Sequence, residues 1–511
     1  MTARRGWPLL LAALGALQTL AFTHTWAWPL PLLCVALLAW SAARVAPRRA
    51  AGFGWAFGSG WLTAGTWWLF ISLHRYGGLP APLAAAAVFV LAALLSLYLA
   101  LAIGLYARWR QGRPLVDALL FAALWLLAEL ARGVIFTGFP WLASGYAQLD
   151  GPLAALAPWI GVYGIGAVGA LVAALIALAA PAFGAARQRR WVLLAAAALL
   201  LLPALVGTVS FSRPTGSLTV SLLQSNVAQD DKFATEQMPA ELAWVAARLR
   251  DAHADLVVAP ETAVPLLPEQ LDEMVPGYWQ ALRGLFADGS RAALVGAPLG
   301  SFERGYTNSV VGLSAAASDY RYDKVHLVPF GEFIPTGFRW FTNLMNIPLG
   351  DFDRGARNPP SFVVKGERAA PNICYEDLFG EELARRFIDP SRAPTLFVNV
   401  SNMGWFGDGD AIAQHLNISR MRTLEFQRPM VRATNTGATA VIDDRARVTA
   451  LLPFATRGVL DGRVQGRSGV TPFAWWAARF SLWPLLVLAL AVLGAARTLA
   501  ACSPPSPSTR C

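Results

Sequence analysis

The chain has 511 residues, of which 55% are hydrophobic and only 14% are charged. A soluble domain usually carries about 25% charged residues, and the mean hydropathy of this chain is +0.45. This composition excludes a disordered chain, a disulfide-rich scaffold and an ordinary cytosolic enzyme. It indicates that at least part of the chain lies in lipid.

The formal charge of +10 is located entirely in the first 211 residues. They contain 13 Arg, no Lys and three acidic residues, and the remaining residues are neutral as a group. A basic chain often binds nucleic acid. Here, however, the Arg residues lie in short gaps between apolar runs, which is the pattern of membrane topology. We therefore expect a membrane protein without a nucleic-acid partner.

Eight apolar runs are close to the length of about 20 residues that a membrane span needs. They cover residues 7–23, 26–43, 51–71, 80–106, 115–135, 152–183, 191–211 and 480–500. The Arg residues cluster in alternate gaps, and the positive-inside rule then places both termini in the cytoplasm. The long segment between the seventh and eighth runs would lie outside, which in a bacterial inner membrane means the periplasm.

These runs predict four regions. Residues 1–211 would form a transmembrane bundle of seven spans, residues 212–470 an extramembrane domain, residues 471–501 a final span, and residues 502–511 a disordered cytoplasmic tail.

Short β-rich runs recur in the extramembrane region, at 218–223, 255–259, 293–297, 309–313, 361–364, 395–400 and 439–442. Helical patterns lie between some of them, at 239–254 and 268–287. Strands that alternate with helices predict an α/β domain.

The gap at residues 133–150 is rich in aromatic residues and glycine, and it includes Trp141 and Tyr146. Composition alone favours an interfacial aromatic belt, and the alternative is a lipid-handling loop that faces the outer domain. Glu129 and Arg132 precede this loop and are three residues apart, so they can pair on one face of a helix.

Cys374 is the single cysteine of the extramembrane region, which therefore cannot form an internal disulfide. There is no CxxC pair or His cluster, so no metal site is predicted. A lone thiol is usually a small core residue. Cys374, however, follows a β-like stretch and precedes a helix-like one at 378–387. A nucleophile at such a junction lies near a helix N-terminus, whose dipole favours the thiolate.

A thiol nucleophile needs a base, and Glu261 is a candidate. It ends the apolar run at 255–259, and α/β folds place functional groups at the carboxyl ends of strands. The alternative is that Glu261 only caps the turn after the strand.

Lys324 is one of three Lys against 39 Arg. A compact ammonium can stabilise an oxyanion, whereas an isolated Lys is more often solvated.

The order Glu261, Lys324, Cys374 resembles the carbon–nitrogen hydrolase (nitrilase) superfamily. A domain of this kind between seven spans and one span is similar to the bacterial apolipoprotein N-acyltransferases, over nearly the whole chain. The strings that carry the resemblance are GFPWLASGYAQLDGPL (138–153), PET (260–262), KVHLVPFGEFIP (324–335), ICYED (373–377), WFGD (405–408) and RPMVRATNTGATAVID (428–443).

The resemblance implies a role for each of these residues. Glu261 would be the general base, Lys324 the oxyanion stabiliser and Cys374 the nucleophile. Glu332 would be a second acid that orients the Lys, while Tyr375 and Glu376 would shape the site behind the thiol. Trp405 and Phe406 would lie on a mobile loop near the lipid, and Trp141 and Tyr146 on the membrane loop. In the family pattern we expect an acid and a small residue where this chain has Met403 and Gly404.

The implied fold is a membrane α-helical bundle of about eight spans with a nitrilase-like αββα sandwich. The implied reaction is a ping-pong acyl transfer without a cofactor. A phospholipid, with phosphatidylethanolamine expected, would donate an acyl chain through a thioester to the diacylglyceryl-cysteine of an apolipoprotein. A membrane-tethered amidase would use the same triad and admit water. A transporter is a third possibility, but internal repeats and mid-membrane acids are its usual signs.

Overall fold

The computed structural model describes residues 6–501, except Phe233, Ala317, Thr336, Phe338 and residues 340–350. The predicted tail at 502–511 therefore lies outside the described residues. The chain forms two compact units. The first contains the residues up to Trp67, Ala86–Val209 and the residues from Leu482 onward, and the second contains Trp68–Ala85 and Ser210–Ser481. The predicted final span at 471–501 is thus divided between the units.

The first unit is a helical bundle. Its helices are α1 (Trp7–Leu17), α2 (Leu20–Thr23), α3 (Pro29–Ala42), α4 (Pro47–Gly65), α6 (Ala81–Trp109, shared with the second unit), α7 (Pro114–Val134), α8 (Ala157–Leu178), α9 (Ala186–Leu201), α10 (Pro203–Val206) and α18 (Trp483–Ala501). Many begin with Pro in the first turn, where the missing N–H is not needed. Each of the eight predicted apolar runs coincides with at least one of these helices.

Five helical segments of the described chain are long and apolar enough to cross a membrane, and a sixth is added if α17 (Pro472–Phe480) and α18 count as one interrupted span. The predicted number of eight is therefore approximate. The run Trp7–Thr23 is short, and α4 is rich in glycine and less apolar. The predicted class, an apolar helical bundle joined to an α/β domain, is confirmed.

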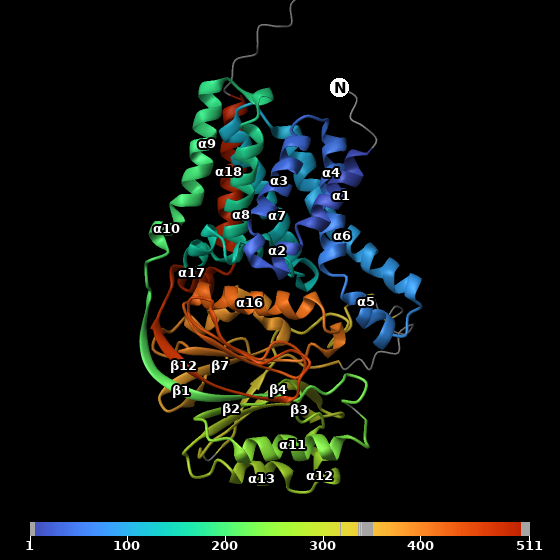
Figure 1. Cartoon of the computed structure of the whole chain (residues 1–511), viewed down its shortest axis with the longest axis vertical. Coiled ribbons are helices and arrows are strands. Elements are labelled where there is room, and N and C mark those ends of the chain that lie inside the picture. Colours follow the sequence, from blue (N-terminus) through green and yellow to red (C-terminus); the bar gives the residue numbers. More distant parts are fainter. Residues whose placement is uncertain are drawn as a thin grey trace, which may run out of the picture. The chain divides into compact units, whose positions relative to one another are not determined.

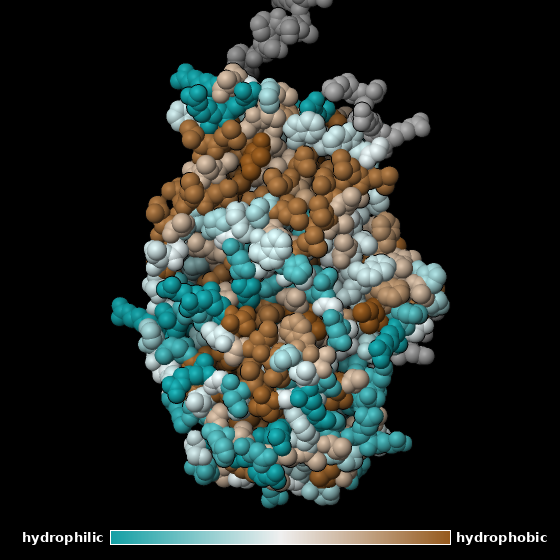
Figure 2. Space-filling view, in the orientation of Figure 1, coloured by the Kyte–Doolittle hydropathy of each residue, from teal (hydrophilic) through white to brown (hydrophobic). Residues whose placement is uncertain are grey.

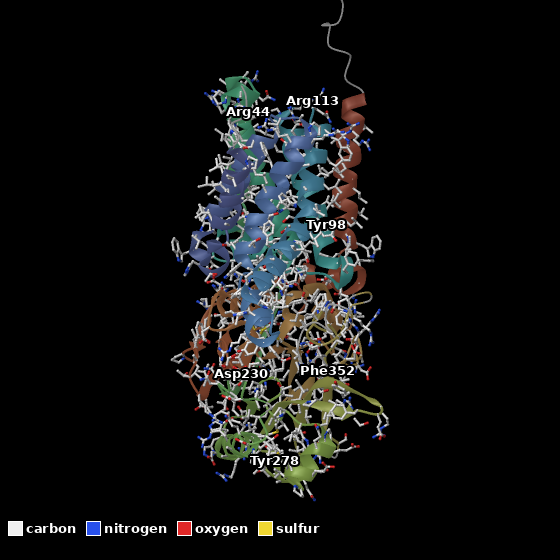
Figure 3. All side chains as sticks on the ribbon, turned by 90° about the vertical axis from the view of Figure 1, so that its right-hand side faces the viewer. Arg44, Tyr98, Arg113, Asp230, Tyr278 and Phe352 are labelled. Carbon is white, nitrogen blue, oxygen red and sulfur yellow. The ribbon has the colours of Figure 1, made fainter. Side chains whose placement is uncertain are left out.

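The outer surface of the bundle is apolar. Leu9, Leu101 and Leu201 have 77%, 63% and 71% of their surface exposed, and Figure 2 shows a hydrophobic belt over the helices of this unit. Figure 3 shows Arg44 and Arg113 at the same end of the bundle. An apolar belt with Arg at one end is the surface that a lipid bilayer requires.

Glycines bring α4 into close contact with its neighbours in the bundle. A Cβ on Gly60 would lie 1.9 Å from the carbonyl oxygen of Ala12 in α1, and a Cβ on Gly15 would lie 2.0 Å from that of Phe57 in α4. Small residues allow helices to approach in membranes, where no hydrophobic force drives them together. The glycines that lower the hydropathy of α4 therefore serve its packing.

Gly60→Val should destabilise the bundle, because the added side chain meets the α1 backbone; overpacking typically costs about 1–3 kcal/mol. The matched control is Gly52→Val on the same helix, where a Cβ would meet no atom within 4 Å. Thermal unfolding of both purified variants in detergent would check this. Equal melting temperatures for the two variants would contradict the close approach of α1 and α4.

The second unit contains two six-stranded sheets. The first has the order β12-β1-β2-β3-β4-β5 and the second the order β11-β10-β9-β8-β7-β6. The strands of the first sheet are β1 (Ser212–Gln224), β2 (Leu256–Val258), β3 (Ala292–Ser301), β4 (Gly305–Leu313), β5 (Tyr320–Asp323) and β12 (Gly458–Gly469). Those of the second are β6 (Phe362–Val364), β7 (Glu367–Ile373), β8 (Leu396–Ser401), β9 (Met430–Thr434), β10 (Ala440–Ile442) and β11 (Val448–Leu451).

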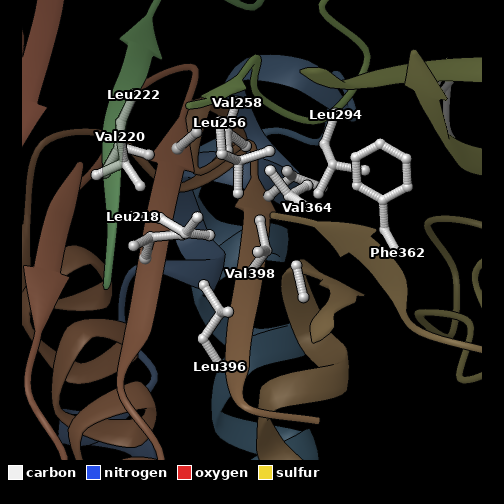
Figure 4. Packing of buried hydrophobic residues seen from close by; sticks show 14 of the residues in the cluster. Leu218, Val220, Leu222, Leu256, Val258, Leu294, Phe362, Val364, Leu396 and Val398 are labelled. Atoms are coloured by element: carbon white, nitrogen blue, oxygen red, sulfur yellow. The ribbon is translucent and has the colours of Figure 1, made fainter. Parts of the chain in front are cut away.

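The two sheets face each other across an apolar core. Figure 4 shows side chains of both sheets meeting there, among them Val220, Val258, Val364 and Val398. The outer face of the first sheet packs against α11 (Met238–Asp251), α12 (Pro268–Met274) and α13 (Tyr278–Gly284). The outer face of the second packs against α15 (Gly380–Leu383), α16 (Asp410–Phe426) and α17, as Figure 1 shows for α11 and α16. The predicted αββα sandwich is confirmed.

Local differences from the sequence prediction have physical causes. The single helix predicted at 268–287 is two helices, because Gly277 adopts a φ of +75° between them. All seven predicted β-rich runs lie in strands, but β5, β9, β11, β12 and helix α16 were not predicted.

Candidate active site

Cys374 lies immediately after β7 and begins a 3₁₀ turn, η7 (Cys374–Leu378). Its φ is +51°, in the left-handed region that residues other than glycine rarely adopt. Strained backbone of this kind gathers at functional sites, where the surrounding structure holds it in place. The predicted strand-to-turn junction at Cys374 is thus present.

The structure brings the predicted acids and lysine together. Lys324 follows β5, and its Nζ donates to Oε1 of Glu332 over 2.9 Å and lies 3.6 Å from Oε1 of Glu261. Glu261 follows β2 at the end of an apolar strand, as predicted. All three side chains are buried, and only 1% of the surface of Lys324 is exposed. The described part of the chain holds no group of three or more His, Cys, Asp or Glu side chains that could bind a metal ion.

The charges of this cluster set the protonation of the nucleophile. Burial would lower the pKa of Lys324, but the carboxylates of Glu332 and Glu261 raise it above its ordinary value. Burial raises the pKa of Cys374 to about 12, with a further increase from Glu261 and an opposing effect from Lys324. The resting nucleophile is therefore a thiol, and it needs a base. The prediction that a helix dipole favours the thiolate is wrong, because burial and the neighbouring carboxylates outweigh a single short turn.

Glu376 connects the turn that carries Cys374 to the segment that carries Lys324. Its Oε2 accepts from the Ile373 amide at 2.7 Å and from the Tyr322 hydroxyl at 2.6 Å, and its Oε1 accepts from the Val325 amide at 2.7 Å. The buried carboxylate therefore fixes the spacing between the nucleophile and the ammonium.

Tyr375 packs beside this turn. Its ring lies 5.7 Å from that of His326 and 5.3 Å from that of Phe379, measured between centroids. Tyr375 and Glu376 thus lie in the turn that Cys374 begins, and their role in shaping the site behind the thiol stays a prediction.

His415 of α16 also supports the nucleophile, and the sequence did not single it out. Its Nε2 lies 3.1 Å from the carbonyl oxygen of Cys374, and its Nδ1 lies 3.1 Å from a guanidinium nitrogen of Arg432. A carbonyl accepts and a guanidinium donates, so the proton is on Nε2. Burial and Arg432 lower the pKa of His415 well below its usual range, which keeps this tautomer neutral. A lone His on a helix carries no local signal for such a contact.

Lys232 is a second buried ammonium that sequence reasoning left without a role. Its Nζ donates to the backbone carbonyl of Glu261 at 3.0 Å. Burial lowers the pKa of Lys232 to about 8, although Glu261 and Cys374 both oppose that change. The rarity of Lys in this Arg-rich chain was the only signal that could have found it.

Trp405 and Phe406 lie in the short turn η9 (Gly404–Phe406) and contact the segment between α4 and α6. The rings of Phe406 and Trp68 are 4.6 Å apart, and those of Trp405 and Tyr76 are 5.3 Å apart, both edge to face. Met403, where an acid was expected, is buried. A role of the two aromatic residues at the lipid stays a prediction.

Trp141 and Tyr146 belong to the first unit, whereas the residues of the triad belong to the second. Both are buried, with 3% and 2% of their surface exposed. Their loop is held by the predicted pair of Glu129 and Arg132, 3.6 Å apart. Arg132 donates to the carbonyl oxygens of Phe139 and Trp141 at 3.1 and 2.6 Å. A substrate role for the buried Trp141 and Tyr146 stays a prediction.

Comparison with known proteins shows the family of the chain. Residues 14–175 match the model of the apolipoprotein N-acyltransferase N-terminal domain, and residues 219–472 match that of the carbon-nitrogen hydrolases. The chain is 54% identical over 499 residues to the apolipoprotein N-acyltransferase of Verminephrobacter eiseniae, with 92% of each chain covered. The chain belongs to the apolipoprotein N-acyltransferase family. It is therefore an enzyme of the carbon-nitrogen hydrolase superfamily.

Two further matches are a second curated relative and a solved structure. The apolipoprotein N-acyltransferase of Ralstonia nicotianae is 48% identical over 472 residues, which cover 91% of this chain and 88% of the relative. A crystal structure of a CN-hydrolase superfamily protein from Xanthomonas campestris aligns with 52% of this chain and 96% of its own, with a TM-score of 0.38 and 20% identity.

Lys324→Arg should reduce acyltransferase activity by about 100-fold or more, because the larger, planar guanidinium group of Arg does not replace a compact ammonium between two buried carboxylates. The control is Lys365→Arg, since Lys365 is half exposed and pairs with Asp255. We expect the control to keep near-normal turnover of a synthetic lipopeptide. Similar rates for the two variants would remove Lys324 from the site.

Gly296→Ala should also impair the enzyme, because a Cβ at this position in β3 would lie 2.3 Å from the Pro260 carbonyl oxygen and 2.8 Å from the Glu261 Cα. The displaced carboxylate should lower kcat by about tenfold or more, since small misplacements of a catalytic group are costly. At Gly284 a Cβ meets no atom within 4 Å, so Gly284→Ala should keep its kcat. A normal kcat in folded Gly296→Ala would contradict the tight fit behind Glu261.

Proposed function

We propose that this protein transfers a fatty acyl chain from a phospholipid, with phosphatidylethanolamine as the expected donor, to the N-terminal amine of the diacylglyceryl-cysteine of apolipoproteins. The observation that carries the proposal is the buried cluster of Lys324 with Glu261 and Glu332, whose charges act with burial on the pKa of the Cys374 thiol. The family to which the chain belongs supports the lipoprotein acceptor.

In the first half-reaction Glu261 takes the proton of the Cys374 thiol as the sulfur attacks the ester carbonyl carbon. The negative charge that develops on the carbonyl oxygen is stabilised by the ammonium of Lys324. The ester C–O bond then breaks, and Glu261 returns the proton to the departing oxygen of the lysophospholipid. The acyl chain remains on Cys374 as a thioester.

In the second half-reaction the free amine of the acceptor attacks the thioester carbonyl carbon. Glu261 takes a proton from the amine and passes it to the sulfur as the C–S bond breaks, so the sulfur leaves as the Cys374 thiol and Glu261 is a carboxylate again. The product is an amide. The burial of Glu261, Lys324 and Glu332 favours this transfer over hydrolysis, because exclusion of water protects a reactive acyl group.

A membrane location suits both substrates, because each carries its own lipid anchor. Confinement to one membrane raises the effective concentration of two anchored reactants. The five span-capable helices support a multi-pass membrane protein, and the alternation of Arg clusters supports an inner-membrane topology. We propose that residues 212–470, which include the triad, form the catalytic domain and lie in the periplasm.

The test is the intact mass of the purified full-length protein after incubation with phosphatidylethanolamine and no acceptor. We expect a gain of one fatty-acyl group that hydroxylamine removes. Rapid hydrolysis, in which fatty acid accumulates and no adduct forms on folded protein, would contradict acyl storage and favour the amidase.

Cys374→Ser and Cys374→Ala should both lose the hydroxylamine-sensitive adduct and overall acyl transfer while they keep the wild-type melting temperature. The small change in side-chain volume and the partial exposure of Cys374 make unfolding unexpected. The matched control is Cys34→Ala in α3, a buried thiol of the first unit, which should keep the adduct. Transfer that persists in either Cys374 variant would exclude the thioester route.

A further inference from the structure

Asn308 of β4 lies between the two carboxylates of the site. Its Nδ2 donates to Oε1 of Glu261 at 2.7 Å and to Oε1 of Glu332 at 2.8 Å. Ionised carboxylates only accept hydrogen bonds, so the amide nitrogen must face them and each of its two hydrogens serves one acid. The backbone carbonyl of Asn308 also accepts from the Lys324 amide at 2.8 Å.

This orientation of the amide leaves its oxygen without a partner. Asn308 is 3% exposed, and its Oδ1 is buried without a hydrogen bond to any residue that the structure describes. An unpaired buried acceptor is destabilising, and the few that occur in native proteins need an explanation. The explanation here is that both amide hydrogens are directed at the acids.

The charges of the cluster show why a neutral donor is useful. Both carboxylates lie near the ammonium of Lys324, whereas the second buried ammonium, that of Lys232, donates to the backbone carbonyl of Glu261. An amide that donates to both carboxylates favours their charged forms without a further positive charge. A further cation in the place of Asn308 would stabilise the Cys374 thiolate and weaken the need for a base.

The same contacts distinguish the two oxygens of Glu261. Oε1 receives Asn308 and lies near Lys324, whereas no hydrogen bond from a described residue reaches Oε2. The free oxygen is the one that can take a proton from the thiol or from an amine.

We propose that Asn308 is a positioning residue that binds the carboxylate forms of Glu261 and Glu332 through their Oε1 atoms and leaves Oε2 of Glu261 as the proton acceptor. The proposal rests on the base role of Glu261 in the proposed function. It concerns the base and the thiol alone, and so it holds whatever the acyl donor is.

The experiment measures the rate at which iodoacetamide alkylates Cys374 in the full-length protein, as a function of pH. In the wild type, the rate of alkylation should fall at low pH, where a protonated Glu261 can no longer assist it. This fall is the acidic limb of the pH–rate profile. Asn308→Leu has a similar size and no N–H groups. Loss of two donors that favour the carboxylate should move this acidic limb upward by about one pH unit, so that the rate below the limb falls about tenfold.

Asn308→Asp keeps the shape of the side chain and adds a third carboxylate, so it should move the limb in the same direction and serves if Asn308→Leu does not fold. The control is Gln224→Met, which removes a buried amide that bonds to the carbonyls of Pro453 and Thr456. Its acidic limb should coincide with that of the wild type.

A limb at the wild-type pH in either folded Asn308 variant would overturn the proposal. A loss of rate that is equal at every pH would also overturn it, if the limb does not move and the melting temperature falls as much as in Gln224→Met. That result would indicate a purely structural role for Asn308. Glu261→Gln separates the two proposals. If its profile equals that of the wild type, Glu261 is not the base and the proposed function fails with it.

Discussion

The burial of the Lys324 ammonium is the constraint on which the rest of the site depends. A charge removed from water is strongly destabilising unless it is paired and hydrogen-bonded. Glu332 and Glu261 pair it, one at 2.9 Å and the other at 3.6 Å. Glu261 and Glu332 act with burial to raise the pKa of Cys374, and Lys324 opposes them. A protonated thiol thus accompanies Glu261, the base of the proposed mechanism.

The residues of the site come from distant parts of the second unit, and two kinds of contact hold them in register. Side-chain carboxylates bond to backbone amides, as Glu376 does to Ile373 and Val325. Neutral side chains support charged or strained groups, as Asn308 supports the two acids and His415 supports the carbonyl of Cys374. The second kind places polar groups near the thiol without a further net charge.

The sequence predicted the residues of the candidate triad but not those that position them. Glu261, Lys324 and Cys374 stand in recognisable strings, so their order was informative. Asn308 and His415 act through contacts that span 47 and 41 residues of the chain, and nothing local marks them. The protonation of Cys374 was also missed, because it depends on burial and on two acids that only the fold brings close.

The same distinction holds for the fold. Strands that are mostly apolar and contain β-branched residues, such as β2 and β8, were predictable. β12 was not, because its sequence GVLDGRVQGRSG is polar and lies at a sheet edge. Helix α16 was missed because much of what it buries is polar, including His415, Arg422 and Glu425. That Trp68–Ala85 lies with the second unit follows from aromatic contacts such as Trp68 to Phe406, which composition does not predict.

The central claim is that an acyl group on Cys374 passes directly to an amine. The most direct measurement isolates the acylated full-length enzyme free of phospholipid and adds a synthetic diacylglyceryl-cysteine peptide. The account predicts that the acyl mass leaves Cys374 and appears as an amide on the peptide in equal amount, and that a peptide with an acetylated N-terminus leaves the enzyme acylated. An adduct that persists with the free amine, or that is released as fatty acid at the same rate with either peptide, would contradict it.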